Sequence, residues 1–239
     1  MNWQTCVGEN REELSQAASK QLAQIAQAAL ESRGRFDLAL AGGHTPKRLY
    51  EILASEYRDR IDWKRTHLFW GDERYVSADD PLSNYRMARE ALVGPLGLTP
   101  ENVHPMPTSF VEPDDAARAY EKLLREHFGP EGPQFDLVLL GIGPEGHTAS
   151  LFPNSPSLNE KQRLVLAVRV AAQPPLRLTL TLPVINAAGR VFFLASGADK
   201  KPILSKIFSL GPGGSPEFPA SLIHARDGVT LFLDRAATP

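Results

Sequence analysis

Apolar residues recur at steps of three and four from Asn10 to Glu31, which predicts a helix with one buried stripe. Asn10 can cap the first turn with Glu13 reaching back, and Gly34 lies just past the expected end. The stripe consists of Leu14, Ala17, Ala18, Leu22, Ile25, Ala26, Ala29 and Leu30.

Short apolar runs, typical of strands, alternate with further helical patterns along the rest of the chain. We predict strands over residues 36–41, 66–70, 135–140, 164–170, 176–182, 191–196 and 229–233. Helices are predicted from Thr45-Pro46 (with Thr45 as the cap), over 83–92, from 113, and over 199–208. This alternation predicts an α/β fold, with a mainly parallel sheet, helices on both faces and one domain over residues 1–239. The Pro- and Gly-rich stretch Leu210–Pro219 is expected to be a surface loop.

Composition narrows the classes of partner. The chain has 239 residues, of which 42% are hydrophobic, and its formal net charge is −2. A pI of about 6.3 gives no reason to expect nucleic acid or an anionic membrane as a partner. No apolar run approaches the ~18 residues that span a bilayer, and no signal peptide is recognised at the N-terminus. The lone cysteine, Cys6, excludes an intrachain disulfide. We therefore expect a cytoplasmic monomer that acts on a small molecule.

Unusual residues follow four of the predicted strands, at the carboxyl ends where open parallel sheets bind ligands. In Gly42-Gly43-His44-Thr45, glycines and free helix amides could cradle a phosphate, or form only a tight turn. Gly71-Asp72-Glu73-Arg74 places three charges at a strand end. Arg74 could hold a carboxylate, a phosphate or an oxyanion, and Asp72 could be a base or orient a partner, or the segment could be a solvated loop.

The segment Gly141–Thr148 (GIGPEGHT) formally matches the dinucleotide fingerprint G-x-G-x-x-G. The fingerprint needs a carboxylate about 20 residues later to hold a ribose, and residues 168–172 (VRVAA) contain none. A nicotinamide cofactor is therefore not expected. His147 can take a proton from water, and Glu145 is near enough in sequence to orient or charge-balance its ring. The alternative is that His147 is a structural histidine.

Two cations complete the candidate site. Lys200 opens a predicted helix, where the dipole is already positive, and a bound anion would remove that mismatch. Arg177 begins another predicted strand and could face the same cavity, although each residue could also be a plain surface charge. The six histidines lack H-x-H and H-x-x-x-H spacing, so we expect no metal and no cofactor.

Taken in chain order, these motifs resemble the 6-phosphogluconolactonase family of the soluble bacterial and eukaryotic type. They are GGHTP (42–46), GDER (71–74), SNY (83–85), GIGPEGHTASLFP (141–153), Arg177 before LTLTLP, and GADK (197–200). The resemblance runs from about residue 10 to the C-terminus. It implies a Rossmann-like fold similar to that of glucosamine-6-phosphate deaminase. The implied reaction is hydrolysis of 6-phospho-D-glucono-1,5-lactone to 6-phosphogluconate in the oxidative pentose phosphate pathway.

The resemblance also implies roles for individual residues. His147 would be the general base that activates water, and Arg74 would hold the substrate or the developing oxyanion. The 6-phosphate would bind to the Gly42–Thr45 loop, Arg177 and Lys200, without cofactor or metal.

The chain departs from the family pattern at two positions. The family usually has Asp where this chain has Glu145, so either Glu145 or Asp72 could be the carboxylate that tunes His147. The first loop often has Ser where this chain has His44, which leaves the contact of that side chain with phosphate open.

Two other functions are alternatives to lactone hydrolysis. An amino-sugar-phosphate isomerase or deaminase on the same scaffold would use Asp72 to move a proton, but such enzymes usually have an acidic residue where this chain reads Leu151-Phe152-Pro153. A sugar-phosphate sensor attached to a transcription regulator would need a helix-turn-helix and a basic surface, and the sequence contains neither pattern.

Overall fold

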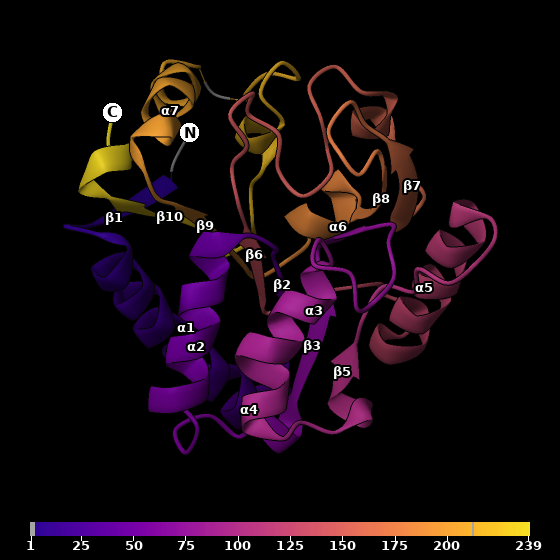
Figure 1. Ribbon diagram of the computed structural model, residues 1–239. Coiled ribbons are helices and arrows are strands. Elements are labelled where there is room, and N and C mark those ends of the chain that lie inside the picture. Colours follow the sequence, from indigo (N-terminus) through magenta and orange to yellow (C-terminus); the bar gives the residue numbers. More distant parts are fainter. Residues whose placement is uncertain (1–2, 212) are drawn as a thin grey trace.

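Two β-sheets organise the chain in the computed structural model, which describes residues 3–211 and 213–239 (Figure 1). The main sheet has seven parallel strands in the order β1-β10-β9-β6-β2-β3-β5. A smaller antiparallel sheet has the order β4-β8-β7. The strands are β1 (Trp3–Gly8), β2 (Phe36–Leu40), β3 (Thr66–Trp70), β4 (Asp72–Arg74), β5 (Val103–His104), β6 (Leu137–Leu140), β7 (Val165–Arg169), β8 (Leu176–Leu180), β9 (Arg190–Ala195) and β10 (Val229–Asp234).

Helices flank the main sheet, so the predicted single-domain α/β class is confirmed. In Figure 1, α1 and α2 pack side by side in front of the sheet, with α3 next to α2, while α5 packs against β7 of the smaller sheet. The α-helices are α1 (Arg11–Arg33), α2 (His44–Glu56), α3 (Asn84–Ala88), α4 (Gly94–Leu96), α5 (Pro113–Phe128), α6 (Leu182–Asn186) and α7 (Lys201–Phe208). One π-helical turn, Arg89–Val93, joins α3 to α4.

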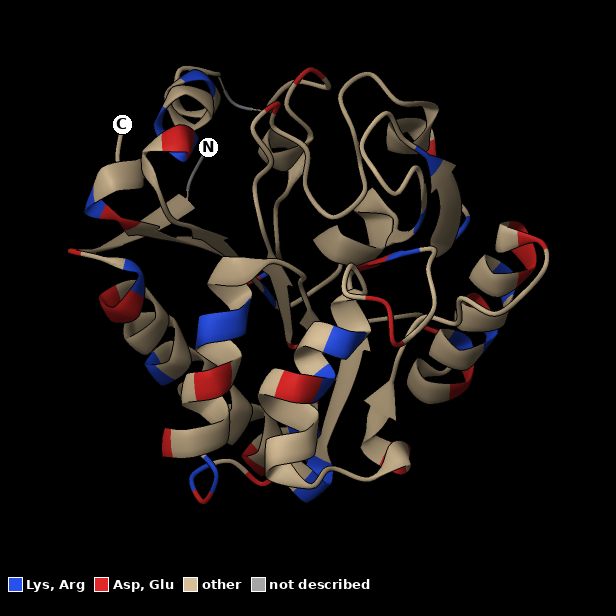
Figure 2. Cartoon of the chain, in the orientation of Figure 1, with Lys and Arg blue, Asp and Glu red and all other residues tan. Residues whose placement is uncertain are grey.

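The core lies between the main sheet and its helices. Every residue of β2 and of β6 is buried, as expected of central parallel strands covered on both faces. Most Lys, Arg, Asp and Glu residues lie on the helices and loops around the sheet (Figure 2). The strands therefore form an apolar core, and the polar residues that follow their carboxyl ends can form a site.

The ends of α1 follow the sequence signals. The Asn10 side chain accepts a hydrogen bond from the Glu13 amide (3.0 Å), and Gly34 terminates the helix in the left-handed region (φ 75°). The Glu13 carboxylate bonds to the Glu9 amide (2.8 Å), one residue before the cap. Both predicted boundary residues are thus confirmed.

Two predictions about the strand-to-helix connections are wrong. The helix expected to begin behind a Thr45 cap begins at His44, and its N-cap is Gly43, which has no side chain to donate or accept. Gly43 adopts φ 103°, a conformation that favours glycine, so the backbone turns two residues earlier than a Thr45 cap would require. Asp72–Arg74, expected in a loop, forms β4.

The smaller sheet was not predicted as a separate unit. Residues 164–170 and 176–182 were expected as strands; they form β7 and β8 of this sheet, and Leu182 already belongs to α6. The connection between the two strands is too short for a parallel crossover, so they pair as an antiparallel hairpin, Val165 opposite Leu180. β1 and β5 were not predicted, although both are strands of the main sheet.

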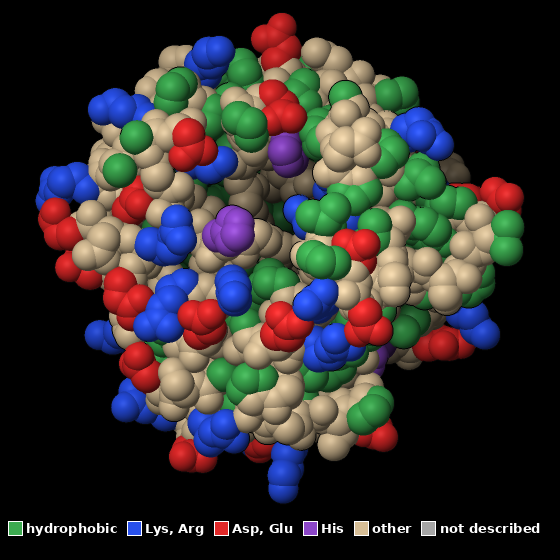
Figure 3. Space-filling model, viewed as in Figure 1, with side chains coloured by type: hydrophobic (Ala, Val, Ile, Leu, Met, Phe, Trp, Pro, Cys, Tyr) green, Lys and Arg blue, Asp and Glu red, His purple; other side chains and the backbone are tan. Residues whose placement is uncertain are grey.

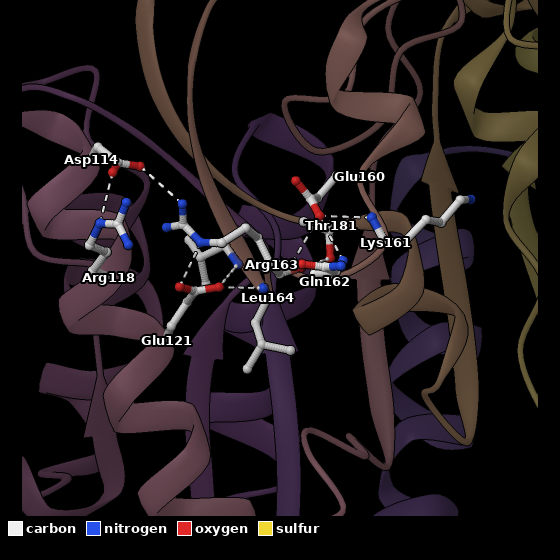
Figure 4. Close-up of polar contacts among 10 residues, drawn as sticks. Asp114, Arg118, Glu121, Glu160, Lys161, Gln162, Arg163, Leu164 and Thr181 are labelled. Carbon is white, nitrogen blue, oxygen red and sulfur yellow. Dashed lines mark hydrogen bonds and ion pairs between the residues drawn. The ribbon is translucent and has the colours of Figure 1, made fainter.

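Glu121 of α5 joins that helix to the start of β7 (Figure 4). Its carboxylate accepts hydrogen bonds from Arg163 Nε (2.8 Å) and from the backbone amides of Leu164 and Val165. Arg163 also contacts Asp114 Oδ1 (3.3 Å). Because Glu121 is nearly buried, these bonds hold the small sheet against α5 more firmly than an exposed pair would.

Two further predictions concern single segments. Within residues 3–211 and 213–239, no helix is both long and apolar enough to cross a bilayer. The predicted loop Leu210–Pro219 contains Pro212, which lies outside the described residues; among the others, Ser215 and Phe218 form an isolated β-bridge, and a 3₁₀ turn starts at Pro219.

Candidate active site

A cavity of about 420 Å³ opens beyond the carboxyl ends of β2 and β6, and Figure 3 shows this face hollowed near its middle, with histidine and basic side chains around the hollow. This is the edge of the sheet where parallel α/β folds bind ligands. Nine of the ten predicted site residues line the cavity, namely Gly42, Gly43, His44, Thr45, Asp72, Arg74, His147, Arg177 and Lys200. The tenth, Glu145, contacts His147.

Two neighbours hold the His147 ring in place within the loop after β6. On one side the ring stacks on Phe152, with centroids 4.2 Å apart and planes 14° from parallel. On the other side it lies so close to Gly143 that a Cβ there would be 2.1 Å from ring atoms Cε1 and Nδ1. No helix starts in described residues 141–155, so the glycines of this segment do not build a dinucleotide turn. They allow the ring to approach the backbone.

Glu145 lies beside His147, with Oε2 3.1 Å from ring atom Nδ1. The angle is poor for a hydrogen bond, since Nδ1 has no partner of good geometry among the described residues. Burial lowers the pKa of His147, and the negative charges of Glu145 and then Asp72 partly oppose that shift. The lowered pKa favours the neutral ring, which can accept a proton.

Asp72 is fixed at the cavity by two side chains. Ser150 Oγ donates to Oδ2 (2.6 Å) and Asn84 Nδ2 approaches Oδ1 (3.3 Å). Asn84 Nδ2 also donates to the Asp72 carbonyl oxygen (2.9 Å). The carboxylate is buried, with 8% of the residue exposed, and it lies close enough to His147 to influence the charge on that ring.

Gly42 allows Asn84 to reach the cavity. A Cβ on Gly42 would lie 1.9 Å from Asn84 Oδ1, so only glycine fits beneath this amide. Asn84 Oδ1 is itself buried without a hydrogen-bond partner in the described chain. An acceptor without a partner at a cavity wall is costly unless a ligand donates to it.

Glu73 links β4 to the start of α3 through hydrogen bonds. Its two carboxylate oxygens accept hydrogen bonds from the backbone amides of Arg74 (2.7 Å), Asn84 (2.8 Å) and Tyr85 (2.7 Å), and from Ser83 Oγ (3.2 Å). Burial raises the pKa of Glu73 to about 7, and the three amides act in the opposite direction. Glu73 therefore positions its neighbours without lining the cavity.

Arg74 and Arg177 are direct cross-strand partners on β4 and β8, so two guanidinium groups face the cavity together. Arg74 Nη1 donates to the Leu82 carbonyl (2.7 Å), while its Nε is buried without a partner among the described residues. Arg177 is held by the Pro174 and Gln173 carbonyl oxygens (2.7 and 3.3 Å). Desolvation, followed by the positive charge of Arg74, lowers the pKa of Arg177. An anion would relieve this repulsion.

The starts of two helices also line the cavity. α2 begins at His44, so first-turn amides of this helix lack intrahelical acceptors at the cavity. Lys200 ends a short 3₁₀ turn, Ala198–Lys200, and directly precedes α7. Its Nζ lies 3.3 Å from Asp199 Oδ2. The start of α2 and Lys200 therefore line the same cavity as Arg74 and Arg177.

Several lining residues were missed as site candidates: Arg11, Asn84, Ser196 and Asp199. Asn84 lies within the SNY motif, which could have identified it. Arg11 belongs to the first turn of α1, and its Nε reaches Ser196 Oγ (3.4 Å) at the end of β9. No local pattern marks Arg11, because only the packing of α1 beside β10 brings it to the cavity.

Known proteins resemble this chain over nearly its whole length. A family model described as glucosamine-6-phosphate isomerases/6-phosphogluconolactonase matches residues 9–232. A 6-phosphogluconolactonase from Synechocystis is 45% identical over 87% of this chain and 86% of its own. The crystal structure of 6-phosphogluconolactonase from Thermotoga maritima superposes with a TM-score of 0.85, at 30% identity, and covers 98% of this chain and 100% of that one. A monomeric glucosamine-6-phosphate deaminase has a TM-score of 0.81 at 24% identity over 98% of each chain, which is a likeness of fold alone.

Proposed function

The chain belongs to the family of glucosamine-6-phosphate isomerases and 6-phosphogluconolactonases, and we propose that it hydrolyses 6-phospho-D-glucono-1,5-lactone to 6-phosphogluconate, the lactone-opening step of the oxidative pentose phosphate pathway. Relatives named 6-phosphogluconolactonase support this substrate, among them those from Synechocystis and Nostoc, at 45% and 41% identity. The single observation that carries the mechanism is the position of the His147 ring, which packs against Gly143 and Phe152 at the edge of a cavity lined by cations.

Hydrolysis needs a base for water and a donor for the carbonyl oxygen. Glu145 lies at Nδ1 of His147, which leaves Nε2 to accept the proton of a water molecule. The water oxygen attacks C1 of the lactone, and Arg74 stabilises the negative charge that develops on the carbonyl oxygen. The bond between C1 and the ring oxygen then breaks, and the ring oxygen receives the proton from His147. No covalent intermediate forms.

The 6-phosphate would bind where the start of α2 and the turn before α7 line the cavity. The amides at the start of α2 and the ammonium of Lys200 supply positive charge there, and Arg177, the cross-strand partner of Arg74, adds another cation. A phosphate held there would fix one end of the substrate, and the sugar ring would then place the lactone carbonyl near His147.

The family also includes isomerases, so an isomerase or deaminase activity is the main alternative to lactone hydrolysis. An isomerase or deaminase would use Asp72 to move a proton between adjacent carbons, and Asp72 does line the cavity. In this chain, however, the loop after His147 carries the apolar Phe152, whose ring stacks on the imidazole. Ammonia release from glucosamine 6-phosphate would favour the rival.

The test is timed hydrolysis of freshly prepared 6-phosphogluconolactone, measured against the rate in buffer alone. We expect the purified chain to accelerate ring opening and His147→Ala to lower turnover by about 10²-fold or more, because a general base contributes roughly 10²–10⁴. His224→Ala, at an exposed histidine outside the cavity, is the matched control. Near-normal turnover by His147→Ala would remove His147 as the base but leave the lactonase assignment in place.

The predicted monomer, cytoplasmic location and domain limits of 1–239 remain proposals. Size-exclusion chromatography and cell fractionation address the first two, and limited proteolysis addresses the third.

A further inference from the structure

Three histidines that are far apart in the sequence meet on the side of the fold away from the cavity. His67 belongs to β3, His104 to β5 and His127 to α5. Each offers one ring nitrogen, and these three nitrogens all lie within 4.8 Å of one another. His67 is the second residue of its strand, whereas the active-site cavity lies beyond the last residues of β2 and β6. The sequence spacing of these three histidines gives no sign of the cluster.

The spacing of the rings is close to that of metal ligands. His67 Nδ1 and His104 Nε2 are 3.1 Å apart. Two nitrogens bound tetrahedrally to Zn²⁺ at 2.0–2.1 Å would be about 3.3–3.4 Å apart. This pair therefore needs almost no movement, and the His127 ring must approach by roughly 1 Å or slightly more to complete a three-histidine set. All three side chains are partly exposed, so an ion can reach them.

A carboxylate and two aromatic rings surround the cluster. Asp37, which is fully buried, contacts His127 Nε2 through Oδ1 (2.7 Å), and Arg35 Nε donates to its Oδ2 (3.0 Å). Metal-binding histidines commonly have such a carboxylate on the ring, where it fixes orientation and raises basicity. Phe69 stacks on His104 with centroids 4.5 Å apart and meets His127 edge-on at 5.0 Å. The surroundings are thus a rigid and mainly apolar shell with one oriented anion.

The donor set selects the kind of ion. Three imidazoles and no exposed oxygen ligand suit Zn²⁺, Co²⁺ or Ni²⁺ and disfavour Mg²⁺ and Ca²⁺, which need several oxygens. His67 Nδ1 and His104 Nε2 lie at hydrogen-bond distance (3.1 Å), so the ring proton that they share would be displaced when an ion binds.

We propose that His67, His104 and His127 form a binding site for one divalent transition-metal ion of the Zn²⁺ class, with Asp37 orienting His127 and solvent at the remaining position. Three protein ligands and one open position are the arrangement that zinc adopts at accessible sites. The site is separate from the hydrolytic cavity, and lactone opening does not require it.

The test is calorimetric titration of the full, tag-free chain with ZnCl₂ after treatment with a chelator, together with absorption spectra of the Co²⁺-loaded chain. We expect one ion per chain and the intense visible bands of four-coordinate Co²⁺. His67→Gln, His104→Gln and His127→Gln should each weaken Zn²⁺ binding at least tenfold, since loss of an outer carboxylate alone typically costs 10–100-fold. Gln keeps a polar group in the cluster, and near-ultraviolet circular dichroism checks that each variant folds.

Two controls separate this site from other histidines. His224→Gln, on an exposed loop, and His147→Gln, in the hydrolytic cavity, should bind Zn²⁺ as the parent chain does. Absence of saturable binding by the parent chain would overturn the proposal and leave the cluster as aromatic packing. Binding abolished by His147→Gln but retained in the three cluster variants would place the ion in the cavity, which also overturns it.

Discussion

Gly143 offers a direct test of how His147 is positioned. A Cβ at this residue would lie 2.1 Å from Cε1 and Nδ1 of the His147 ring, whereas ordinary contact begins at 3.4 Å. Gly143 does not have a positive φ, so alanine fits the backbone itself. The substitution Gly143→Ala is therefore a steric perturbation directed at one imidazole.

The size of the effect follows from that overlap. To relieve it, the ring must move by about 1.3 Å, and a misplacement of about 1 Å at a reacting centre can cost roughly 10²-fold. The ring cannot swing freely because Phe152 stacks on its other face at 4.2 Å. We expect Gly143→Ala to lower kcat/KM for the lactone by about 10²-fold, equivalent to about 2.7 kcal/mol in the activation barrier.

Gly141→Ala provides a control in the same loop. A Cβ on Gly141 would meet nothing within 4 Å, and its φ is not positive either. Timed lactone hydrolysis at several substrate concentrations should therefore give near-normal kinetics for Gly141→Ala. Thermal melting of both variants shows whether a lost rate reflects lost fold.

Two results would contradict this role of Gly143. If Gly143→Ala and Gly141→Ala were equally active, the position of the His147 ring would not limit the rate. If Gly143→Ala lowered activity further in a chain already carrying His147→Ala, the alanine would act through something other than the imidazole, because effects transmitted through one group do not add.

Three further predictions concern the charges. Glu145→Gln removes a charge that holds the His147 pKa up against burial, so that pKa should fall and the acid limb of kcat/KM should move to lower pH. Lys200→Ala should raise KM about 10- to 100-fold with little change in kcat, as expected for loss of a charged hydrogen bond to a remote phosphate, whereas neighbouring Lys201→Ala should not. Glu121→Ala should lower the free energy of unfolding by about 1.5–3 kcal/mol, measured in urea, because it removes a charged acceptor at the start of β7.

Each of these predictions has a contrary outcome. An acid limb that moves more with Asp72→Asn than with Glu145→Gln would make Asp72 the carboxylate that tunes His147. A fall in kcat at constant KM for Lys200→Ala would contradict a phosphate contact. For the third, Glu126→Ala removes an exposed charge from the same helix and should cost less than about 0.5 kcal/mol; an equal loss would contradict the importance of burial.

The main sheet could be predicted from the sequence because its central strands are continuous apolar runs, as in Leu137–Leu140. The edges were harder. β1 (WQTCVG) is partly exposed and carries no clear alternation, and β5 has only two residues. The antiparallel pairing of β4 with β8 depends on a long-range register, Arg74 opposite Arg177, that no local pattern encodes.

Site residues could be predicted where glycines and charged or reactive side chains occur together at the end of a predicted strand. Glycines next to charged residues at strand ends pointed to His147, Arg74 and Lys200, and all three line the cavity. Arg11 and the histidine cluster gave no such signal. His104 comes beside His67 only because β5 pairs with β3, with Phe69 opposite His104, and α5 then brings His127 across from a distant segment.

The cavity draws its walls from the start of α1, from α2, from both sheets and from the turn before α7. Such a site consists almost entirely of non-local contacts, and forming each of them requires the closure of a long loop. The pairing of Arg74 with Arg177 and the position of Lys200 both depend on such contacts. Activity therefore requires the complete topology of the chain, and the return of activity after refolding reports that the whole cavity has formed.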